Sequence, residues 1–307
     1  MRNLFFVLFL INFALCKGEE VALIKINSAI TPSSSSQIER AIKWAESISA
    51  EALIIELNTP GGLLESTREI VQNILNSKVP IIVYVAPSGS RAGSAGVFIT
   101  LSAHIAVMAP GTNIGAAHPV GLDRSSDTSV ISEKIVNDAV AFIRSIAQQK
   151  NRNVEWAERA VRESISSTER EALEQKVIDL VVGSVDSLLI LIDGWEVTTP
   201  IGKRVLKTKG SKVVSYELTF RDRFLDFITN PNVAYILLLI GIYGIFFELY
   251  SPGSIFPGVV GALSLILAAY SLQMLPINYA GLALILLGVV LFLLEIKIAS
   301  YGLLTIG

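Results

Sequence analysis

The chain has 307 residues, a length that accommodates a full domain and additional elements. Its formal net charge is only −2 and 51% of its residues are hydrophobic. This balance excludes the basic footprint of a nucleic-acid-binding protein and is too apolar for a soluble protein of ordinary composition. Apart from Lys297, every Lys and Arg lies within the first 223 residues, so charge is concentrated in the N-terminal part.

The first residues have the pattern of a secretory signal peptide. Arg2 provides a short basic region, residues 4–11 are apolar, and Ala14 and Cys16 place small residues at the −3 and −1 positions of a cleavage site. The apolar run is short for a spanning helix. We therefore expect residues 1–18 to be a signal peptide that directs the following domain out of the cytoplasm. Cleavage after Cys16 or later leaves no thiol in the mature chain.

The next 180 residues or so alternate between strand-like and helix-like patterns. Near-continuous apolar runs, typical of buried parallel strands, lie at 21–26, 52–57, 81–85 and 105–108. Apolar residues at helical spacing lie at 34–48, 63–75, 97–101 and 134–149. Thr168 and Glu171 form a capping box for a short helix, and segments 188–192 and 195–199 complete the domain. This order predicts a layered α/β domain over residues 19–229.

After residue 230 the composition changes to that of a membrane region. No charged residue lies between Glu248 and Glu295. The apolar stretches lie at 233–249, 254–275 and 277–294. We expect three transmembrane helices within 230–307, with Lys297 on the cytoplasmic side. A fourth apolar stretch starts near Ile298 and reaches Gly307, so we expect the chain to be truncated.

Ser94 is the first candidate for chemistry in the α/β part. It lies in the sequence Ala92-Gly93-Ser94-Ala95-Gly96, between a strand-like run and a helical run. A serine at a helix N-terminus can project its hydroxyl beside backbone N–H groups that stabilise an anion, as an activated nucleophile requires. Small residues near a turn also serve close packing, so the motif alone leaves a structural role open.

A glycine-rich turn follows an earlier buried strand, in the sequence Asn58-Thr59-Pro60-Gly61-Gly62. Ligand-handling groups of parallel sheets collect at such strand ends, and consecutive glycines let the backbone turn sharply and expose an N–H group. The alternative interpretation is an ordinary strand-to-helix connection.

The choice of base is narrow. The chain has two histidines: His104, which we expect to be structural, and His118, at the edge of a polar, Ser-rich segment at 119–133 that we expect to be a mobile loop. Lys134 opens the following predicted helix among apolar neighbours. A lysine acts as general base only when neutral, and desolvation favours that form, although lysines at such positions are usually solvated.

Three ordered segments, 58–62, 92–96 and 108–119, together resemble the NfeD family of membrane-bound, ClpP-class serine proteases. The resemblance covers essentially the whole chain. It implies a signal peptide, a ClpP/crotonase-like α/β protease domain and several transmembrane helices. Members often carry a small C-terminal OB-fold domain, whose absence here adds to the expectation of truncation.

By this resemblance Ser94 is the nucleophile, Lys134 is its partner in a Ser-Lys dyad, and the backbone N–H groups of Gly62 and Ala95 form the oxyanion hole. No metal and no cofactor are implied. Soluble ClpP-like peptidases use a histidine at about the spacing that separates His118 from Ser94. His118 is therefore a rival base in a triad, with Asp123 or Asp127 to orient it. We favour Lys134 because the membrane-anchored relatives use the dyad.

The signal peptide and the apolar C-terminal stretches predict a multi-pass membrane protein whose protease domain is extracytoplasmic. The resemblance implies an endopeptidase that cuts hydrophobic segments, with stomatin/flotillin-like membrane proteins as partners or substrates, acting as a homodimer or higher oligomer. One alternative is a non-catalytic membrane scaffold for such a partner. Another is an acyl-CoA enzyme on the crotonase fold, which secretion would separate from cytosolic CoA. A signal peptide peptidase of the same superfamily is an enzymatic neighbour.

Overall fold

The computed structural model describes residues 20–119, 129–217, 231–250 and 255–271, and the single positions 220, 224, 227 and 228. The chain divides into two compact units, Met1–Glu217 and Leu218–Gly307. Several predictions fall outside the described residues: the signal peptide at 1–18, the carboxylates Asp123 and Asp127, most of the loop at 119–133, and the apolar stretches at 277–294 and from Ile298.

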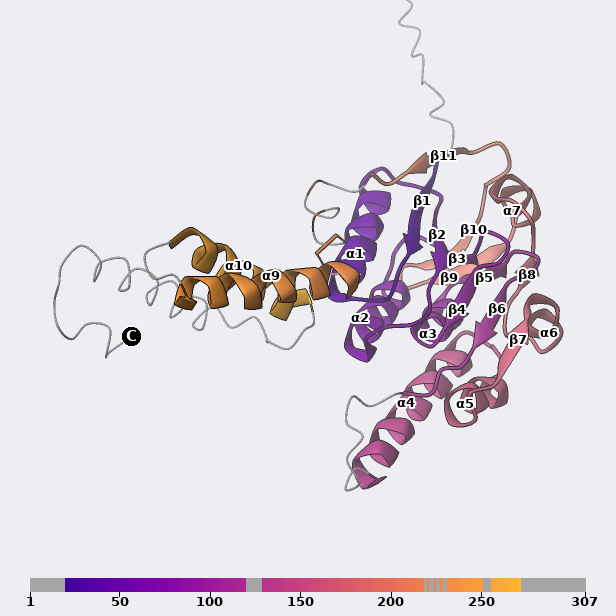
Figure 1. The fold of residues 1–307 in the computed structure, drawn as a ribbon. Coiled ribbons are helices and arrows are strands. Elements are labelled where there is room, and N and C mark those ends of the chain that lie inside the picture. The colour runs from indigo at the N-terminus through magenta and orange to yellow at the C-terminus, as the bar shows by residue number, and fades with distance from the viewer. Residues whose placement is uncertain are drawn as a thin grey trace, which may run out of the picture. The chain divides into compact units, whose positions relative to one another are not determined.

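A fully parallel six-stranded sheet forms the centre of the first unit (Figure 1). Its strand order is β11-β1-β2-β3-β5-β8. The strands are β1 (Glu20–Asn27), β2 (Ala52–Asn58), β3 (Ile81–Val85), β5 (Ile105–Met108), β8 (Leu180–Val181) and β11 (Lys212–Ser215). The predicted α/β layering is confirmed.

Each face of this sheet packs into its own hydrophobic core, which explains why its strands are apolar throughout. In β2, Leu53 and Ile55 enter one core, whereas Ile54 enters the other. Residues of six helices share the first core: α1 (Pro32–Ser47), α2 (Leu64–Leu75), α3 (Ala95–Ser102), α4 (Ser129–Gln149), α5 (Val154–Arg162) and α6 (Glu169–Glu174). The other face packs against α7 (Val185–Leu191) and the antiparallel hairpin β9 (Glu196–Thr199) and β10 (Gly202–Val205).

The capping box predicted from Thr168 and Glu171 is present at the start of α6. The Glu171 backbone N–H donates to Thr168 Oγ1 at 3.4 Å, and the Thr168 N–H donates to the Glu171 carboxylate at 2.8 Å. This reciprocal pairing satisfies two backbone donors that a helix start otherwise leaves open.

A second, three-stranded sheet lies beside the main one and was not predicted. It has the order β4-β6-β7, with β4 (Arg91–Gly93), β6 (Asn113–Gly115) and β7 (Ser166–Thr168). A parallel bridge between Thr59 and Ala92 connects it to the end of β2. The small sheet therefore carries the residues just before Ser94 to the carboxyl end of a central strand, the edge at which ligands of parallel sheets are bound.

The second unit contains two described helices, α9 (Pro231–Tyr250) and α10 (Ile255–Ser271), which pack against each other. A Cβ atom on Gly261 would lie 2.8 Å from the backbone nitrogen of Ile245 and 2.9 Å from the Gly241 oxygen. Glycine thus permits close approach of the two helices. At the same contact, the Glu248 carboxylate accepts a hydrogen bond from the Gly258 N–H at 2.9 Å.

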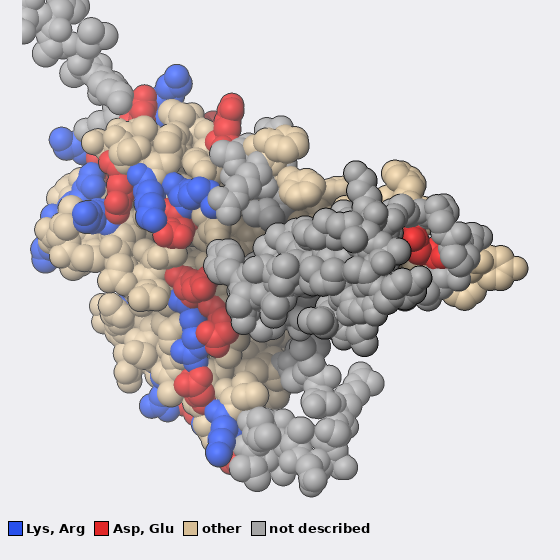
Figure 2. All heavy atoms as spheres, turned by 90° about the vertical axis from the view of Figure 1, so that its left-hand side faces the viewer, with Lys and Arg blue, Asp and Glu red and all other residues tan. Residues whose placement is uncertain are grey.

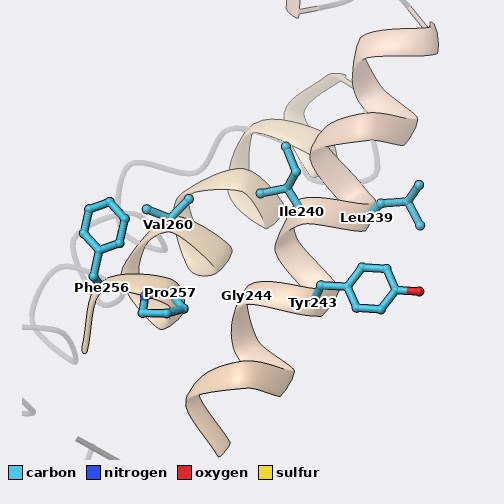
Figure 3. A pocket seen from close by; sticks show the side chains of 7 residues that line it. All are labelled: Leu239, Ile240, Tyr243, Gly244, Phe256, Pro257 and Val260. Carbon is cyan, nitrogen blue, oxygen red and sulfur yellow. The ribbon is translucent and has the colours of Figure 1, made fainter. Parts of the chain in front are cut away.

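An apolar groove of about 400 Å³ opens between α9 and α10 (Figure 3). Its lining residues are Leu239, Ile240, Tyr243, Gly244, Phe256, Pro257 and Val260. In the part of the chain that the structure describes, no helix combines the length and apolarity needed to cross a membrane.

Candidate active site

The glycine-rich turn after β2 is held in a fixed shape by its own hydrogen bonds. The buried Thr59 hydroxyl accepts a hydrogen bond from the Gly61 N–H at 3.2 Å and lies 3.1 Å from the Gly61 carbonyl oxygen. A bridge to Ile30 adds two bonds: the Ile30 N–H donates to the Gly61 carbonyl at 2.8 Å, and the Leu63 N–H donates to the Ile30 carbonyl at 2.9 Å. This pattern uses neither the N–H nor the carbonyl of Gly62, and a Cβ there would lie 2.1 Å from the Ile30 oxygen.

Ser94 lies at the junction of β4 and α3 with a strained backbone. Its φ is 47° and its ψ is −107°, a conformation that is rare for a residue with a side chain. The Ser94 N–H donates to the Gly115 carbonyl at 3.0 Å, which ties the junction to the small sheet. Ser94 is the N-cap residue of α3, yet its side chain makes no capping hydrogen bond. The hydroxyl is therefore not committed to the helix.

The turn and the serine approach so closely that only glycine fits between them. A Cβ on Gly61, whose φ is 127°, would lie 2.6 Å from Ser94 Cβ and 3.2 Å from Ser94 Oγ. A Cβ on Gly93 would lie 2.9 Å from the Pro60 carbonyl oxygen, and one on Gly96 would lie 2.8 Å from the Thr59 methyl group. The fold thus brings together the two motifs that the sequence singled out.

Two backbone donors beside Ser94 have no acceptor among the described residues: the N–H of Gly62 and the N–H of Ala95, the first residue of α3. The first N–H groups of a helix have no partner within it, and they favour an anion at that end. Such donors can stabilise the oxyanion that forms when a serine attacks an acyl carbon.

The two candidate bases lie outside this contact. Lys134 is exposed in the second turn of α4. One end of this helix projects away from the sheet in Figure 1. His118 is exposed, and its Nδ1 lies 2.8 Å from the Val161 carbonyl oxygen. When Nδ1 carries the proton and donates to that oxygen, Nε2 is left as the acceptor. In the described ranges, neither Lys134 nor His118 makes a hydrogen bond or ion pair with Ser94.

His104, the histidine expected to be structural, lies below the surface. Its Nδ1 accepts a hydrogen bond from the Ile81 N–H at 3.0 Å. Burial lowers its pKa to about 3, with further lowering by the positive charges of Lys150 and Arg152. It therefore stays neutral at physiological pH.

Arg152 is itself a buried cross-link. Its guanidinium donates to the carbonyls of Leu101, Ala103 and Val177 at 3.1–3.3 Å and pairs with Asp179 at 2.9 Å. It joins the end of α3 to the segment that leads into β8.

Thr59 and Gly115 shape the site, although they were not assigned a role from sequence. Thr59 fixes the turn through its hydroxyl, and Gly115 supplies the acceptor for the Ser94 N–H. Both lie inside the segments that carry the family resemblance, but a hydroxyl bonded to nearby backbone has no distinctive sequence signal. Within the described ranges, no group of three or more His, Cys, Asp or Glu side chains is arranged to hold a metal ion.

Comparison with known families matches both units. Residues 20–187 match the NfeD1b N-terminal domain, and residues 232–307 match the NfeD integral membrane domain. The chain belongs to the NfeD family. The second match identifies the C-terminal part of this NfeD-family chain as an integral membrane domain.

Two curated relatives align along almost the whole chain. The membrane-bound protease PH1510 of Pyrococcus horikoshii is 38% identical over 291 residues, or 94% of this chain. The membrane protein NfeD1b of Bacillus subtilis is 30% identical over 300 residues, or 96% of this chain. The chain spans 66% of the length of each of these relatives.

Solved structures resemble the first unit. The 1510-N membrane protease from Pyrococcus horikoshii, specific for a stomatin homolog, is 36% identical with a TM-score of 0.60, covering 69% of this chain and 99% of its own. A variant of 1510-N with a lysine changed to alanine, in complex with a substrate peptide, is 37% identical with a TM-score of 0.64, covering 69% of this chain and 98% of its own. A variant with a serine changed to alanine has also been solved.

The charged surface differs from that of a nucleic-acid-binding protein. On the face that Figure 2 presents, Lys and Arg side chains are interspersed with Asp and Glu side chains. This mixed surface agrees with the net charge of −2 and provides no extended positive patch there for a polyanion.

Proposed function

We propose that this chain is a membrane-anchored serine endopeptidase that uses a Ser-Lys dyad. Ser94 Oγ attacks the carbonyl carbon of a peptide bond while neutral Lys134 takes the hydroxyl proton. The N–H groups of Gly62 and Ala95 stabilise the oxyanion. The lysine then gives its proton to the leaving amine, and water hydrolyses the acyl-enzyme to restore Ser94.

One observation supports this proposal above the others. Ser94 occupies a helix N-cap without capping the helix, in a strained conformation, against a glycine turn with an unused N–H. A purely structural serine at that position would be expected to satisfy a helix donor. The relatives add support, because one is a membrane-bound protease and the solved variants of 1510-N alter one serine and one lysine.

For the base, we propose Lys134 rather than His118, because a solved variant of 1510-N alters a lysine. His118 Nδ1 lies 2.8 Å from a backbone carbonyl oxygen, and the carboxylates expected to orient the ring, Asp123 and Asp127, lie outside the described residues. A catalytic triad places a carboxylate at that nitrogen to stabilise the imidazolium. Lys134 shares its helix face with Asp138 and Phe142, two side chains that contact the neighbouring helices.

For the substrate, we propose apolar segments of membrane-associated proteins, with a stomatin-like protein as partner. The support is the stomatin specificity stated for 1510-N and the integral membrane domain at 232–307. We further propose several membrane crossings within 230–307, an extracytoplasmic protease domain, and a homodimer or higher oligomer. Protease accessibility of the first unit in intact and permeabilised cells tests the sidedness.

The decisive experiment compares two serine variants of the full chain on an internally quenched apolar peptide. Ser94→Ala removes the nucleophile, so we expect cleavage to fall by at least about 10³-fold, as is typical when a catalytic serine is removed. It removes no capping hydrogen bond, so we expect the stability of the fold to be unchanged. Ser184 is the matched control, because it caps α7 by accepting a hydrogen bond from the Ser187 N–H at 3.2 Å.

Ser184→Ala is expected to cost about 1 kcal/mol of stability and to leave cleavage intact. Equal cleavage by wild type and Ser94→Ala, or cleavage by neither, would reject the protease and favour the scaffold. Lys134→Ala and His118→Ala, each measured across pH, identify the base. Loss of cleavage in His118→Ala alone would refute the Ser-Lys dyad.

A further inference from the structure

The three elements that carry the proposed site meet in one side-chain cluster, formed by Arg68, Phe98, Asp138 and Phe142. Phe98 lies one turn after Ser94 in α3, and its ring stacks on Phe142 of α4 with 5.6 Å between centroids. The Arg68 guanidinium carbon of α2 lies 4.4 Å from the centroid of the same Phe142 ring. We call these four residues the helix-junction cluster.

Arg68 also forms an ion pair with Asp138 of α4. Asp138 lies one turn before Phe142 and one turn after Lys134, so positions 134, 138 and 142 form one stripe along α4. This stripe therefore contacts α2 and α3 at two successive turns. α2 begins two residues after Gly62, so the cluster joins the glycine turn, the serine helix and the lysine helix.

α4 is anchored in the first hydrophobic core up to Ala139, which is fully buried, whereas residues 133–138 are exposed or half-buried. Lys134 lies five residues from Ala139, about 7.5 Å along the helix at 1.5 Å per residue. A tilt of about 8° at Ala139 moves the lysine by about 1 Å, a displacement that can cost about 100-fold in rate. The Arg68–Asp138 pair is a further attachment between Ala139 and the lysine.

The described residues provide few other restraints on this part of α4. Val136 is half-buried and packs against the first hydrophobic core, whereas residues 133–135, 137 and 138 are exposed. On the side of α5, Arg162 donates to Asn137 at 3.1 Å.

We propose that Arg68 is a positioning residue for the base: it fixes the tilt of α4 and occupies the carboxylate that would otherwise pair with Lys134. The inference rests on the proposed dyad. Without Arg68, the Asp138 carboxylate becomes available to the lysine ammonium at i,i+4, the spacing at which opposite charges on a helix attract. An ammonium held in that pair is not available as a proton acceptor, so general-base catalysis would weaken.

Among the residues that the structure describes, few charged groups surround this part of α4, which allows a pH test. α3 has no charged side chain. α2 carries Glu65, Arg68 and Glu69, of which Glu69 accepts a hydrogen bond from the Ser35 hydroxyl. α5 presents Arg162, which pairs with Glu158, and α4 itself carries Glu133 and Asp138. Of these carboxylates, Asp138 is the one that Arg68 holds.

Activity is measured on the full chain with the internally quenched apolar peptide. For Arg68→Leu we expect kcat to fall by at least about 10-fold with KM within about 2-fold, and the acid limb of kcat/KM to move to higher pH. Adding Asp138→Asn to Arg68→Leu should return the acid limb of kcat/KM to its wild-type pH without restoring kcat. Arg144→Leu is the matched control, because Arg144 also lies in α4 and pairs with Glu158 of α5.

A double electron–electron resonance measurement tests the position of α4 without relying on activity. Spin labels replace the exposed Glu133 in α4 and Gln72 in α2, with Cys16 changed to serine. Arg68→Leu should broaden or shift the distance distribution, and Arg68→Lys should do so less. An unchanged distribution overturns the inference. A changed distribution together with full cleavage by Ser94→Ala would overturn the proposed function instead.

If Arg68→Leu does not fold, Asp138→Asn alone replaces it. This variant breaks the ion pair and leaves Arg68 over the Phe142 ring. A kcat within about 2-fold of wild type and an unchanged distance distribution in Asp138→Asn would likewise overturn the proposal.

Discussion

Alanine at position 61 should abolish the proposed peptidase activity by displacing Ser94. The Cβ would lie 2.6 Å from Ser94 Cβ, whereas ordinary contact begins at about 3.4 Å, so the two segments must separate by about 0.8 Å. A displacement near 1 Å at a reacting group costs about 100-fold in rate. The backbone adds strain, because a φ of 127° is unfavourable for any residue with a side chain, at about 1–3 kcal/mol.

Gly89→Ala separates these two effects. Gly89 has a φ of 87°, but nothing lies within 4 Å of the position that a Cβ would take there, so the variant carries strain without overlap. Both variants should lose about 1–3 kcal/mol in chemical denaturation from backbone strain. Gly61→Ala should lose about 1–3 kcal/mol more from the overlap, together with about 100-fold in kcat. Full activity in Gly61→Ala, or equal losses in both variants, would refute the close approach.

Three further outcomes follow from other contacts. Arg152→Met should lower the free energy of unfolding by about 3 kcal/mol in denaturant titration, because it removes the ion-pair partner of Asp179 and the buried donor to three backbone carbonyls. Arg159→Met, from an exposed pair, should change it by less than about 1 kcal/mol. Burial, with the charge of Arg152, lowers the pKa of Lys150 to about 8, so the unfolded chain binds more protons between pH 8 and 10.5 and stability should rise with pH across that window. Lys150→Met should remove this rise in denaturation curves, and a rise that persists would contradict it. Gly261→Ala should lower the melting temperature in detergent, because the added Cβ would lie 2.8–3.0 Å from backbone atoms of α9, which cannot rotate away. An unchanged melting temperature would argue against close packing of α9 and α10.

Long periodic segments were predictable from sequence, and the boundaries of several agree closely with the structure. The helix expected to open at Lys134 is an exception, because α4 already begins at Ser129, within the segment expected to be a loop. The run at 81–85 coincides with β3 and the run at 105–108 with β5, because strands buried on both faces must be apolar throughout. The helical pattern at 63–75 corresponds to α2, since one face of that helix enters the core. The apolar stretch at 233–249 lies within α9.

The small sheet and the cross-links of the site could not be predicted in the same way. β4, β6 and β7 have three residues each, which is too short for alternation to be visible. Their pairing is set by contacts with residues far along the chain, such as the antiparallel pairing of Ile114 with Ser167. Ser94 and Gly62 were singled out by local sequence, but the approach of Gly61 to Ser94 depends on two turns that are about 30 residues apart and meet only in the fold.

The pairing of β1 with β11 has a consequence for biogenesis. Glu20 lies opposite Lys212 and Leu23 opposite Ser215, so the first and last strands of the sheet are neighbours although about 190 residues separate them. During synthesis, β1 keeps one unpaired edge until residue 215 has left the ribosome, and such late, long-range closure slows folding and exposes strand edges. Completion of the first unit therefore falls only some 17 residues before the start of the membrane domain at residue 232. The pairing of β1 with β11 therefore forms only after nearly all of the first unit has been made, shortly before the integral membrane domain follows in the chain.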